Sequence, residues 1–150
     1  MYCVDTFTIY SHSPIIAASP AAAQTLLRYF GDTLTGADNY DMILTGDLGH
    51  VGSTLFIELM QRDGYKVASK HADCGLLIYD RDKQDVDAGG SGCGCSASVL
   101  CSYVMQGMRE GKLNNVLFIA TGALMSPVSV QQGESIPAIA HLVHLSTKPS

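Results

Sequence analysis

The sequence contains no apolar run that approaches the roughly 20 residues a membrane-spanning helix needs. It is also poor in charge, since 15% of its 150 residues are charged while 47% are hydrophobic. Disordered chains combine low hydrophobicity with high charge, so disorder is excluded. The formal net charge of −5 argues against an electrostatic grip on nucleic acid. We therefore expect one globular domain over residues 1–150, with part of its surface buried against another surface.

The N-terminal residues lack the basic region and long apolar stretch of a secretory signal peptide. The cysteine count is odd, and the spacing is not that of a disulfide-rich secreted domain (Cys3, Cys74, Cys93, Cys95 and Cys101). Free thiols in a reducing compartment, and hence a cytosolic protein, are the expectation.

Apolar periodicity predicts strands that alternate with helices. The expected strands cover residues 4–10, 40–45, 75–79, 115–121 and 136–145, and the expected helices cover 20–30, 53–62 and 95–109. Ser19 is predicted to cap the first helix, with Pro20 at its first position and Gly31 just past its end. The order β-α-β-α-β-α-β-β predicts an α/β fold with a mostly parallel, mixed sheet and a final antiparallel pair at one edge. Helix 95–109 is apolar on nearly every side and is expected to be buried all round.

The glycine-rich segment 89–94 precedes that helix and includes Gly90, Ser91, Gly92 and Cys93. Backbone N–H groups at such a turn suit an anion. The segment has neither the Lys-Ser or Lys-Thr pair of a Walker loop nor the position of a dinucleotide-binding turn. Small residues there also allow a helix to pack closely, which is the commoner explanation. Both interpretations stay open.

Cys93 and Cys95 form a CxC pair, yet a structural zinc site normally needs CxxC-like pairs. We expect no metal and no cofactor.

A second candidate stretch, residues 45–52, follows a strand of the parallel sheet, where ligands bind in such folds. Asp47 and His50 there could form an acid–base pair. Alternatively, Asp47 caps the next helix and His50 only packs. His141 and His144 are expected on opposite faces of the last strand.

Five blocks occur in the order TGDLGHVG, DCGLLIYD, GGSGCGCSA, IATGALMSP and QQGESIPAIAH. In these blocks the chain resembles the stage V sporulation protein AD family, from about residue 19 to 144. The resemblance implies a thiolase-like fold, of which this chain would be only the C-terminal half. It also implies a role in sporulation: binding dipicolinic acid, a small dianion, for its uptake into the developing spore. The implied partners are other stage V uptake proteins. The implied place is the cytoplasmic side of the forespore or spore inner membrane, peripherally attached.

The same resemblance bears on catalysis. In condensing relatives a histidine and an asparagine aim two donors at a thioester oxygen, and here Asp47 and Cys93 fall near those positions. The nucleophilic cysteine of thiolases belongs to the other half of the fold. The chain is therefore expected not to be an enzyme, and an acyl-CoA thiolase or ketoacyl synthase-type acyltransferase fragment is the alternative. The ligand is expected at Asp47, His50, Gly90, Ser91, Gly92 and Cys93.

The apolar helix 95–109 suggests association, because a half fold can cover only one face of it. We expect a homodimer whose contact includes the outer face of this helix and an edge formed by residues 115–121.

Overall fold

Six strands form one mixed sheet in the computed structural model, which describes residues 2–3, 7–9, 14–123, 126–134 and 136–148. From one edge, the order is β4 (His71–Asp73), β3 (Met42–Thr45), β5 (Asn115–Ala123) and β6 (Ile136–Ser146). Both β1 (Tyr2–Cys3) and β2 (Phe7–Ile9) pair with the far side of β6. The predicted mixed α/β sheet is confirmed, but its expected mostly parallel character is wrong, because three of the five strand pairings among the described residues are antiparallel.

Strand β3 runs parallel to β4 and β5, whereas β6 is antiparallel to β5, β1 and β2. The predicted antiparallel pairing of the last two strands is therefore confirmed. Their placement at an edge is wrong, because β1 and β2 cover the free side of β6. The edge predicted at 115–121 is also wrong, since β5 lies between β3 and β6. Of the first predicted strand, residues 4–6 and 10 lie outside the described residues.

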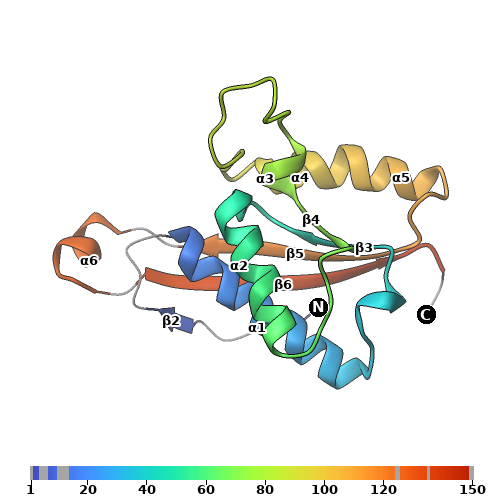
Figure 1. The fold of residues 1–150 in the computed structure, drawn as a ribbon, viewed down its shortest axis with the longest axis horizontal. Helices are drawn as coiled ribbons and strands as arrows, with labels where there is room; N and C mark the ends of the chain where they lie inside the picture. The colour runs from blue at the N-terminus through green and yellow to red at the C-terminus, as the bar shows by residue number, and fades with distance from the viewer. Residues whose placement is uncertain (1, 4–6, 10–13, 124–125, 135, 149–150) are drawn as a thin grey trace.

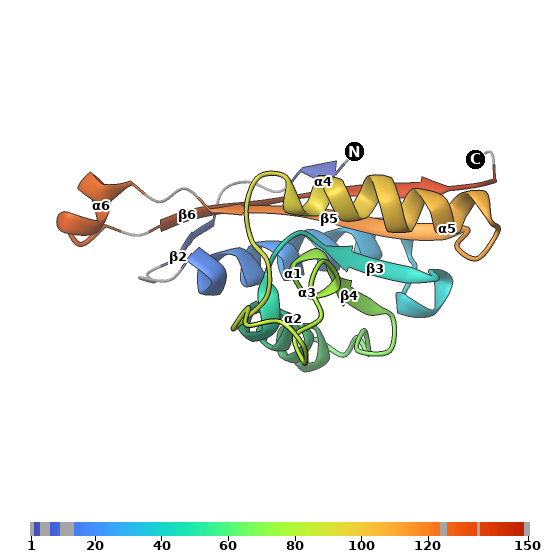
Figure 2. The ribbon, with the colours of Figure 1, turned by 90° about the horizontal axis from the view of Figure 1, so that it is seen from above.

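Helices cover the sheet on both sides (Figures 1 and 2). Helices α1 (Pro14–Thr33) and α2 (Gly49–Arg62) pack on one face, around a core that includes Phe30, Phe56 and Leu117. On the other face lies one long helix, built from α4 (Cys95–Val99), the π-helical turn η2 (Leu100–Val104) and α5 (Met105–Arg109). It packs on a second core that includes Val116 and Phe118. Neighbouring residues of β5 thus point to opposite cores, as strand geometry requires.

Helix α1 begins earlier and ends later than predicted. Pro20 lies inside it rather than at its first position. The predicted cap residue, Ser19, is fully buried, and its hydroxyl donates to the Gly52 carbonyl at 3.0 Å. Ser19 therefore joins α1 to α2 instead of starting a helix.

In the part of the chain that the structure describes, no helix has the length and apolar character needed to cross a membrane.

The predicted stop at Gly31 is also wrong, because the helix continues to Thr33. Leu34 then adopts a left-handed backbone with φ 52°, and the Thr35 N–H donates to the Phe30 carbonyl at 3.2 Å. This is the hydrogen bond of a helix-ending motif whose left-handed position usually holds glycine.

The predicted strand at 75–79 is wrong. Residues Cys74–Leu77 form the short helix α3, and the strand is the preceding, more polar β4. Helix α2 begins at Gly49, before the predicted start at residue 53. Two further short elements complete the fold, η1 (Ala37–Asn39) and α6 (Pro127–Gln131).

The extent of helix 95–109 is confirmed, but its burial on every side is not. Cys95, Val99 and Val104 are buried, whereas Ala97, Cys101 and Tyr103 are exposed. Among the described residues, the sheet and α3 pack against this helix, and the side that carries Ala97, Cys101 and Tyr103 meets solvent.

Replacing Leu34 with glycine is expected to stabilise the protein by about 1 kcal/mol, since a left-handed backbone is costly for any residue with a Cβ. The side chain is 92% exposed, so little packing is lost. Urea unfolding of Leu34→Gly against Leu34→Ala measures this, with alanine as the control that keeps the strain. Equal stability of the two variants would contradict it.

Candidate functional site

The carboxyl ends of β3, β4 and β5 meet at one edge of the sheet, where a parallel sheet places its ligand site. At the end of β4, the buried Asp73 carboxylate accepts three hydrogen bonds. The Thr45 hydroxyl donates to Oδ2 at 2.7 Å, the Leu48 N–H donates to Oδ2 at 2.9 Å, and the Gly49 N–H donates to Oδ1 at 3.0 Å. Asp73 thus satisfies backbone donors at the start of α2. Burial raises the pKa of Asp73, although these hydrogen bonds oppose the rise.

His71 extends this network at the other end of β4. Its Nε2 lies 2.9 Å from the Thr45 hydroxyl, and its ring lies 4.8 Å from the ring of Phe56, centroid to centroid. The single hydroxyl proton of Thr45 is donated to Asp73, so the Nε2 of His71 is the donor in the remaining bond. Burial lowers the pKa of His71 to about 4. The imidazole is therefore neutral at pH 7.

Asp47 joins the two stretches that the sequence singled out. Its Oδ2 accepts hydrogen bonds from the Ser91 hydroxyl at 2.8 Å and from the Gly92 N–H at 2.9 Å. Its own N–H donates to the Thr121 hydroxyl of β5 at 3.4 Å. The Asp47 carboxylate thus accepts a hydrogen bond from the Gly92 N–H, which belongs to the segment predicted to bind an anion.

Close backbone approaches hold the glycine-rich segment in place. A Cβ on Gly49 would meet the Ala88 carbonyl oxygen at 2.7 Å, and one on Gly75 would meet the Gly90 carbonyl oxygen at 2.3 Å. Hydrogen bonds follow the same contacts: the His50 N–H donates to Ala88 at 2.8 Å and the Gly90 N–H to Gly75 at 2.7 Å. The close-packing interpretation of the segment 89–94 is therefore supported at Gly89, where a Cβ would meet the Gly75 carbonyl oxygen at 2.6 Å, but not at Gly92 or Gly94, where a Cβ would meet nothing within 4 Å. Gly92 also needs its freedom, with φ 133°.

The structure brings some predicted residues together and leaves others apart. Asp47, Ser91 and Gly92 are in direct contact, and Gly90 lies beside them in the chain. The His50 and Cys93 side chains are exposed, and within the described residues no hydrogen bond joins the side chain of His50 to Asp47. The capping alternative for Asp47 is wrong, because Asp73 takes the first N–H groups of α2.

Two histidines of β6 lie on opposite faces, as predicted. The exposed His144 makes an edge contact with the Tyr40 ring, with centroids 5.4 Å apart, on the α1 side. His141 is half-buried and points to the other face. His141 pairs with Ala120 of β5, and within the described residues no hydrogen bond joins the side chain of either histidine to Asp47 or Asp73.

The two buried cysteines, Cys74 and Cys95, are unsuited to nucleophilic catalysis. Burial raises the pKa of Cys74 to about 12 and also raises that of Cys95. A buried thiol of raised pKa is a poor nucleophile. Cys93 and Cys101 are free and exposed. Within the described residues, no three side chains among His, Cys, Asp and Glu are grouped in a way that could hold a metal ion.

Sequence reasoning missed Thr45, His71, Asp73 and Thr121 as members of this site. A polar residue at the end of each parallel strand is the signal that could have found Thr45, Asp73 and Thr121. This signal was hidden for Asp73, because the third strand was expected over residues 75–79 and not over the residues that end at Asp73.

Replacing Asp73 with alanine is expected to lower the free energy of unfolding by about 2–4 kcal/mol, because three donors lose a buried acceptor. The matched control, Asp85→Ala on the exposed 80–87 loop, should change it by less than about 0.5 kcal/mol. Denaturant unfolding at pH 7 measures both. Similar losses for the two variants would show that Asp73 does not hold the site together.

The lowered pKa of His71 predicts that the free energy of unfolding depends on pH. Its pKa is about 4 in the folded chain, below the ordinary 6.5, so the unfolded state binds more protons between these values. The stabilisation is complete above pH 6.5 and is lost as the pH falls toward 4, by about 3 kcal/mol. His71→Gln should remove this part of the profile, while the exposed His50→Gln retains it. Unfolding curves from pH 4 to 7 test this, and a parallel profile for His71→Gln would refute it.

Comparison with known proteins identifies the family. A model of the family Stage V sporulation protein AD (SpoVAD) matches residues 11–146. A stage V sporulation protein AD of Bacillus subtilis (strain 168) is 56% identical over 125 residues, which is 83% of this chain and 37% of the relative. The chain spans little more than a third of the length of that relative. The chain belongs to the stage V sporulation protein AD family.

Proposed function

We propose that the chain acts in sporulation, as part of a protein that binds dipicolinic acid for uptake into the developing spore. The observation that carries this proposal is the family match over residues 11–146, together with the 56% identity to the relative from Bacillus subtilis. Other stage V uptake proteins would be its partners, on the cytoplasmic side of the forespore or spore inner membrane. No cofactor or metal enters the proposal.

The proposal includes a thiolase-like fold in which this chain is a single C-terminal half domain. Its support is the order of the elements and the direction of the strands. Strands and crossover helices alternate as far as β5, and β6 then returns antiparallel to it. The long helix α4–η2–α5 would be the central helix of the complete fold.

We place the ligand at the Asp47–Gly92 contact. Ser91 and Gly92 supply an O–H and an N–H donor there, and Gly90, His50 and Cys93 lie nearby in the chain on either side. In this structure the Asp47 carboxylate accepts hydrogen bonds from both of these donors. A dianion that uses the same donors has to displace Asp47 and is repelled by its charge.

This contact argues against the alternative, acyl transfer from coenzyme A thioesters. That chemistry needs two donors aimed at one thioester oxygen. Asp47 is a hydrogen-bond acceptor in this place, and Cys93 is an exposed thiol. Binding without catalysis is therefore the better-supported function.

Titration calorimetry with dipicolinate, carried out with the N-terminal half of the proposed fold present, tests the proposal. The chain should bind dipicolinate, and Asp47→Asn should bind it at least tenfold more tightly, because the substitution removes a competing negative charge near the donors. Absence of binding at millimolar dipicolinate would overturn the proposal.

Two controls sharpen the titration. Asp85→Asn removes the same charge from the distant 80–87 loop and should leave the affinity unchanged. Isophthalate carries the same two carboxylates without the ring nitrogen, and equal affinity for it would show that the site selects only charge. A tighter Asp85→Asn variant would mean that net charge, not Asp47, controls binding.

A further inference from the structure

An exposed aromatic side chain lies against the glycine-rich segment in which the ligand site is proposed. A Cβ on Gly90 would meet Cε2 of Tyr79 at 2.8 Å and Cγ2 of Ile78 at 2.6 Å, so both side chains rest directly on the Gly90 backbone. Tyr79 is nevertheless 42% exposed. Its ring is therefore held one residue away from Ser91, the first of the two donors, while part of the ring stays open to a ligand.

The surface next to this ring is open. Residues 91–94 are exposed, and among the described residues a Cβ on Gly92 or Gly94 would meet no atom within 4 Å. The Gly92 N–H and the Ser91 hydroxyl lie at the start of this open stretch, where they donate to Asp47. A flat ligand that accepts these two hydrogen bonds through a carboxylate therefore has room for its ring beside Tyr79.

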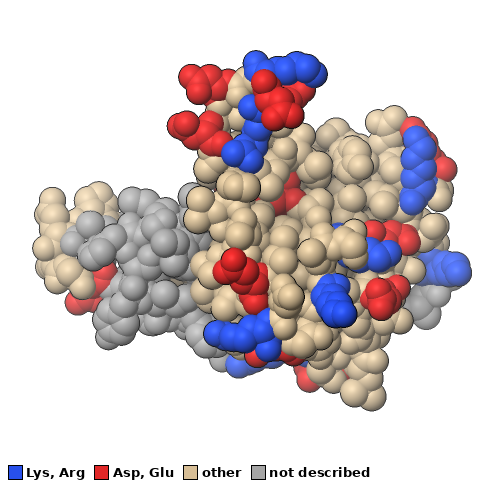
Figure 3. All heavy atoms as spheres, in the orientation of Figure 1, with Lys and Arg blue, Asp and Glu red and all other residues tan. Residues whose placement is uncertain are grey.

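The glycine-rich segment has little positive charge of its own to attract an anion. Residues 84–108 contain no Lys or Arg. On the loop before them, Arg81 donates to the Asp87 carbonyl at 3.1 Å. Lys83 is paired with Asp80 at 2.7 Å. Figure 3 shows this projecting loop at the top, with basic and acidic side chains packed together. On this chain, hydrogen bonds and contact with the ligand ring therefore have to provide most of the binding free energy.

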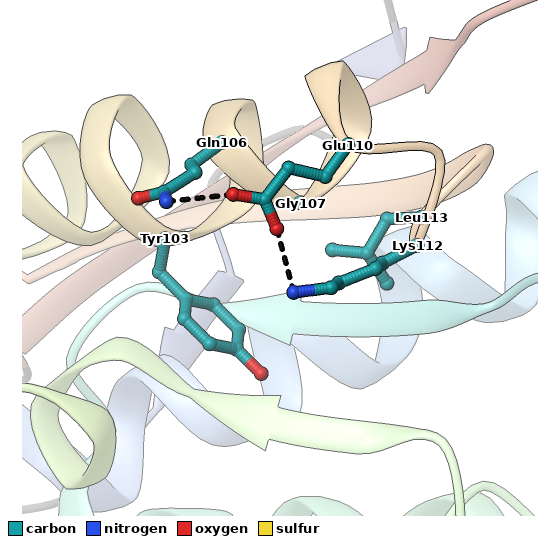
Figure 4. A pocket seen from close by; sticks show the side chains of 6 residues that line it. All are labelled: Tyr103, Gln106, Gly107, Glu110, Lys112 and Leu113. Carbon is teal, nitrogen blue, oxygen red and sulfur yellow. Dashed lines mark hydrogen bonds and ion pairs between the residues drawn. The ribbon is translucent and has the colours of Figure 1, made fainter.

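A second exposed tyrosine, Tyr103, is less suited to such a ligand. It borders a hollow of about 430 Å³ in which Lys112 pairs with Glu110 at 2.6 Å (Figure 4). The side-chain amide of Gln106 donates to the same carboxylate at 2.8 Å. The ammonium and amide donors of this hollow are thus already paired with a carboxylate. Tyr103 also lies on the side of the helix that the other half of the proposed fold would cover.

We propose that Tyr79 determines the class of ligand that the site accepts, by packing against the ring of an aromatic dicarboxylate. This inference rests on the proposed function, because it takes dipicolinate as the ligand. Two aromatic rings in offset-stacked or edge-to-face contact gain free energy beyond the area that they bury. A saturated ring with two carboxylates makes the same hydrogen bonds and lacks this contact. Tyr79 therefore selects planar aromatic dicarboxylates over saturated ones.

Titration calorimetry tests this selection, with the N-terminal half of the proposed fold present. Dipicolinate is compared with cis-cyclohexane-1,3-dicarboxylate, whose ring is saturated. Tyr79→Leu should lower the affinity for dipicolinate about three- to tenfold, and that for the saturated ligand by less than about twofold. Tyr79→Phe is the matched control, because it keeps the ring and should bind both ligands as the wild type does.

The outcomes separate this inference from the proposed function. Equal losses for the two ligands in Tyr79→Leu, or no loss for dipicolinate, would overturn the role of Tyr79 while leaving dipicolinate binding in place. A wild type that binds no dipicolinate would overturn the proposed function and this inference with it.

A tryptophan at the same position reports the contact directly and does not depend on the leucine variant folding. The chain contains no Trp, so Tyr79→Trp adds one indole, and the wild-type complex supplies the background from the N-terminal half. Dipicolinate should quench most of the added emission, because an electron-poor pyridine ring in contact with the excited indole accepts an electron from it. The saturated dicarboxylate should not quench. Unchanged emission when calorimetry shows dipicolinate bound to this variant would refute the contact.

Discussion

The buried carboxylate of Asp73 is the interaction on which the rest of the site depends. A charged group inside a protein is costly unless hydrogen bonds compensate it. Here Thr45 of β3 and the first N–H groups of α2 supply three. This fixes the start of α2 against β3 and β4, and the His50 N–H then meets the Ala88 carbonyl. With the glycine-rich segment held there, Asp47 reaches Ser91 and Gly92.

Strands β3 and β5 are buried on both faces, and this made them predictable from the sequence. Strands β3 and β5 are continuous apolar runs because each lies between two cores, and such runs predict buried parallel strands. The apolar run at 76–78 was wrongly predicted to lie in a strand, because three apolar residues fit one helical turn as well as a strand. The real strand β4 is polar, because His71 and Asp73 both bind Thr45. Its polarity reflects tertiary hydrogen bonds that no local pattern contains.

The location of the site was predictable, while its internal contacts were not. Loops after parallel strands converge on one sheet edge, and this general rule pointed to Asp47 and to the glycine-rich segment. Asp47 and Gly92 are 45 positions apart, so their contact depends on how α2, β4 and α3 return the chain. The role of Ser19 was missed for the same reason, because its acceptor on Gly52 lies 33 residues away.

The pairing of β6 has a consequence for the order in which the chain folds during synthesis. Ala123 and Ala138 pair across 15 positions, so the β5–β6 ladder forms from contacts close in sequence. Tyr2, however, pairs with Leu142, 140 positions later. At about 5–20 residues per second, the ribosome needs on the order of ten seconds or more to make that stretch. The earliest strands therefore leave the ribosome with their backbone hydrogen bonds unmade, and they remain open to wrong partners until almost all of this domain exists.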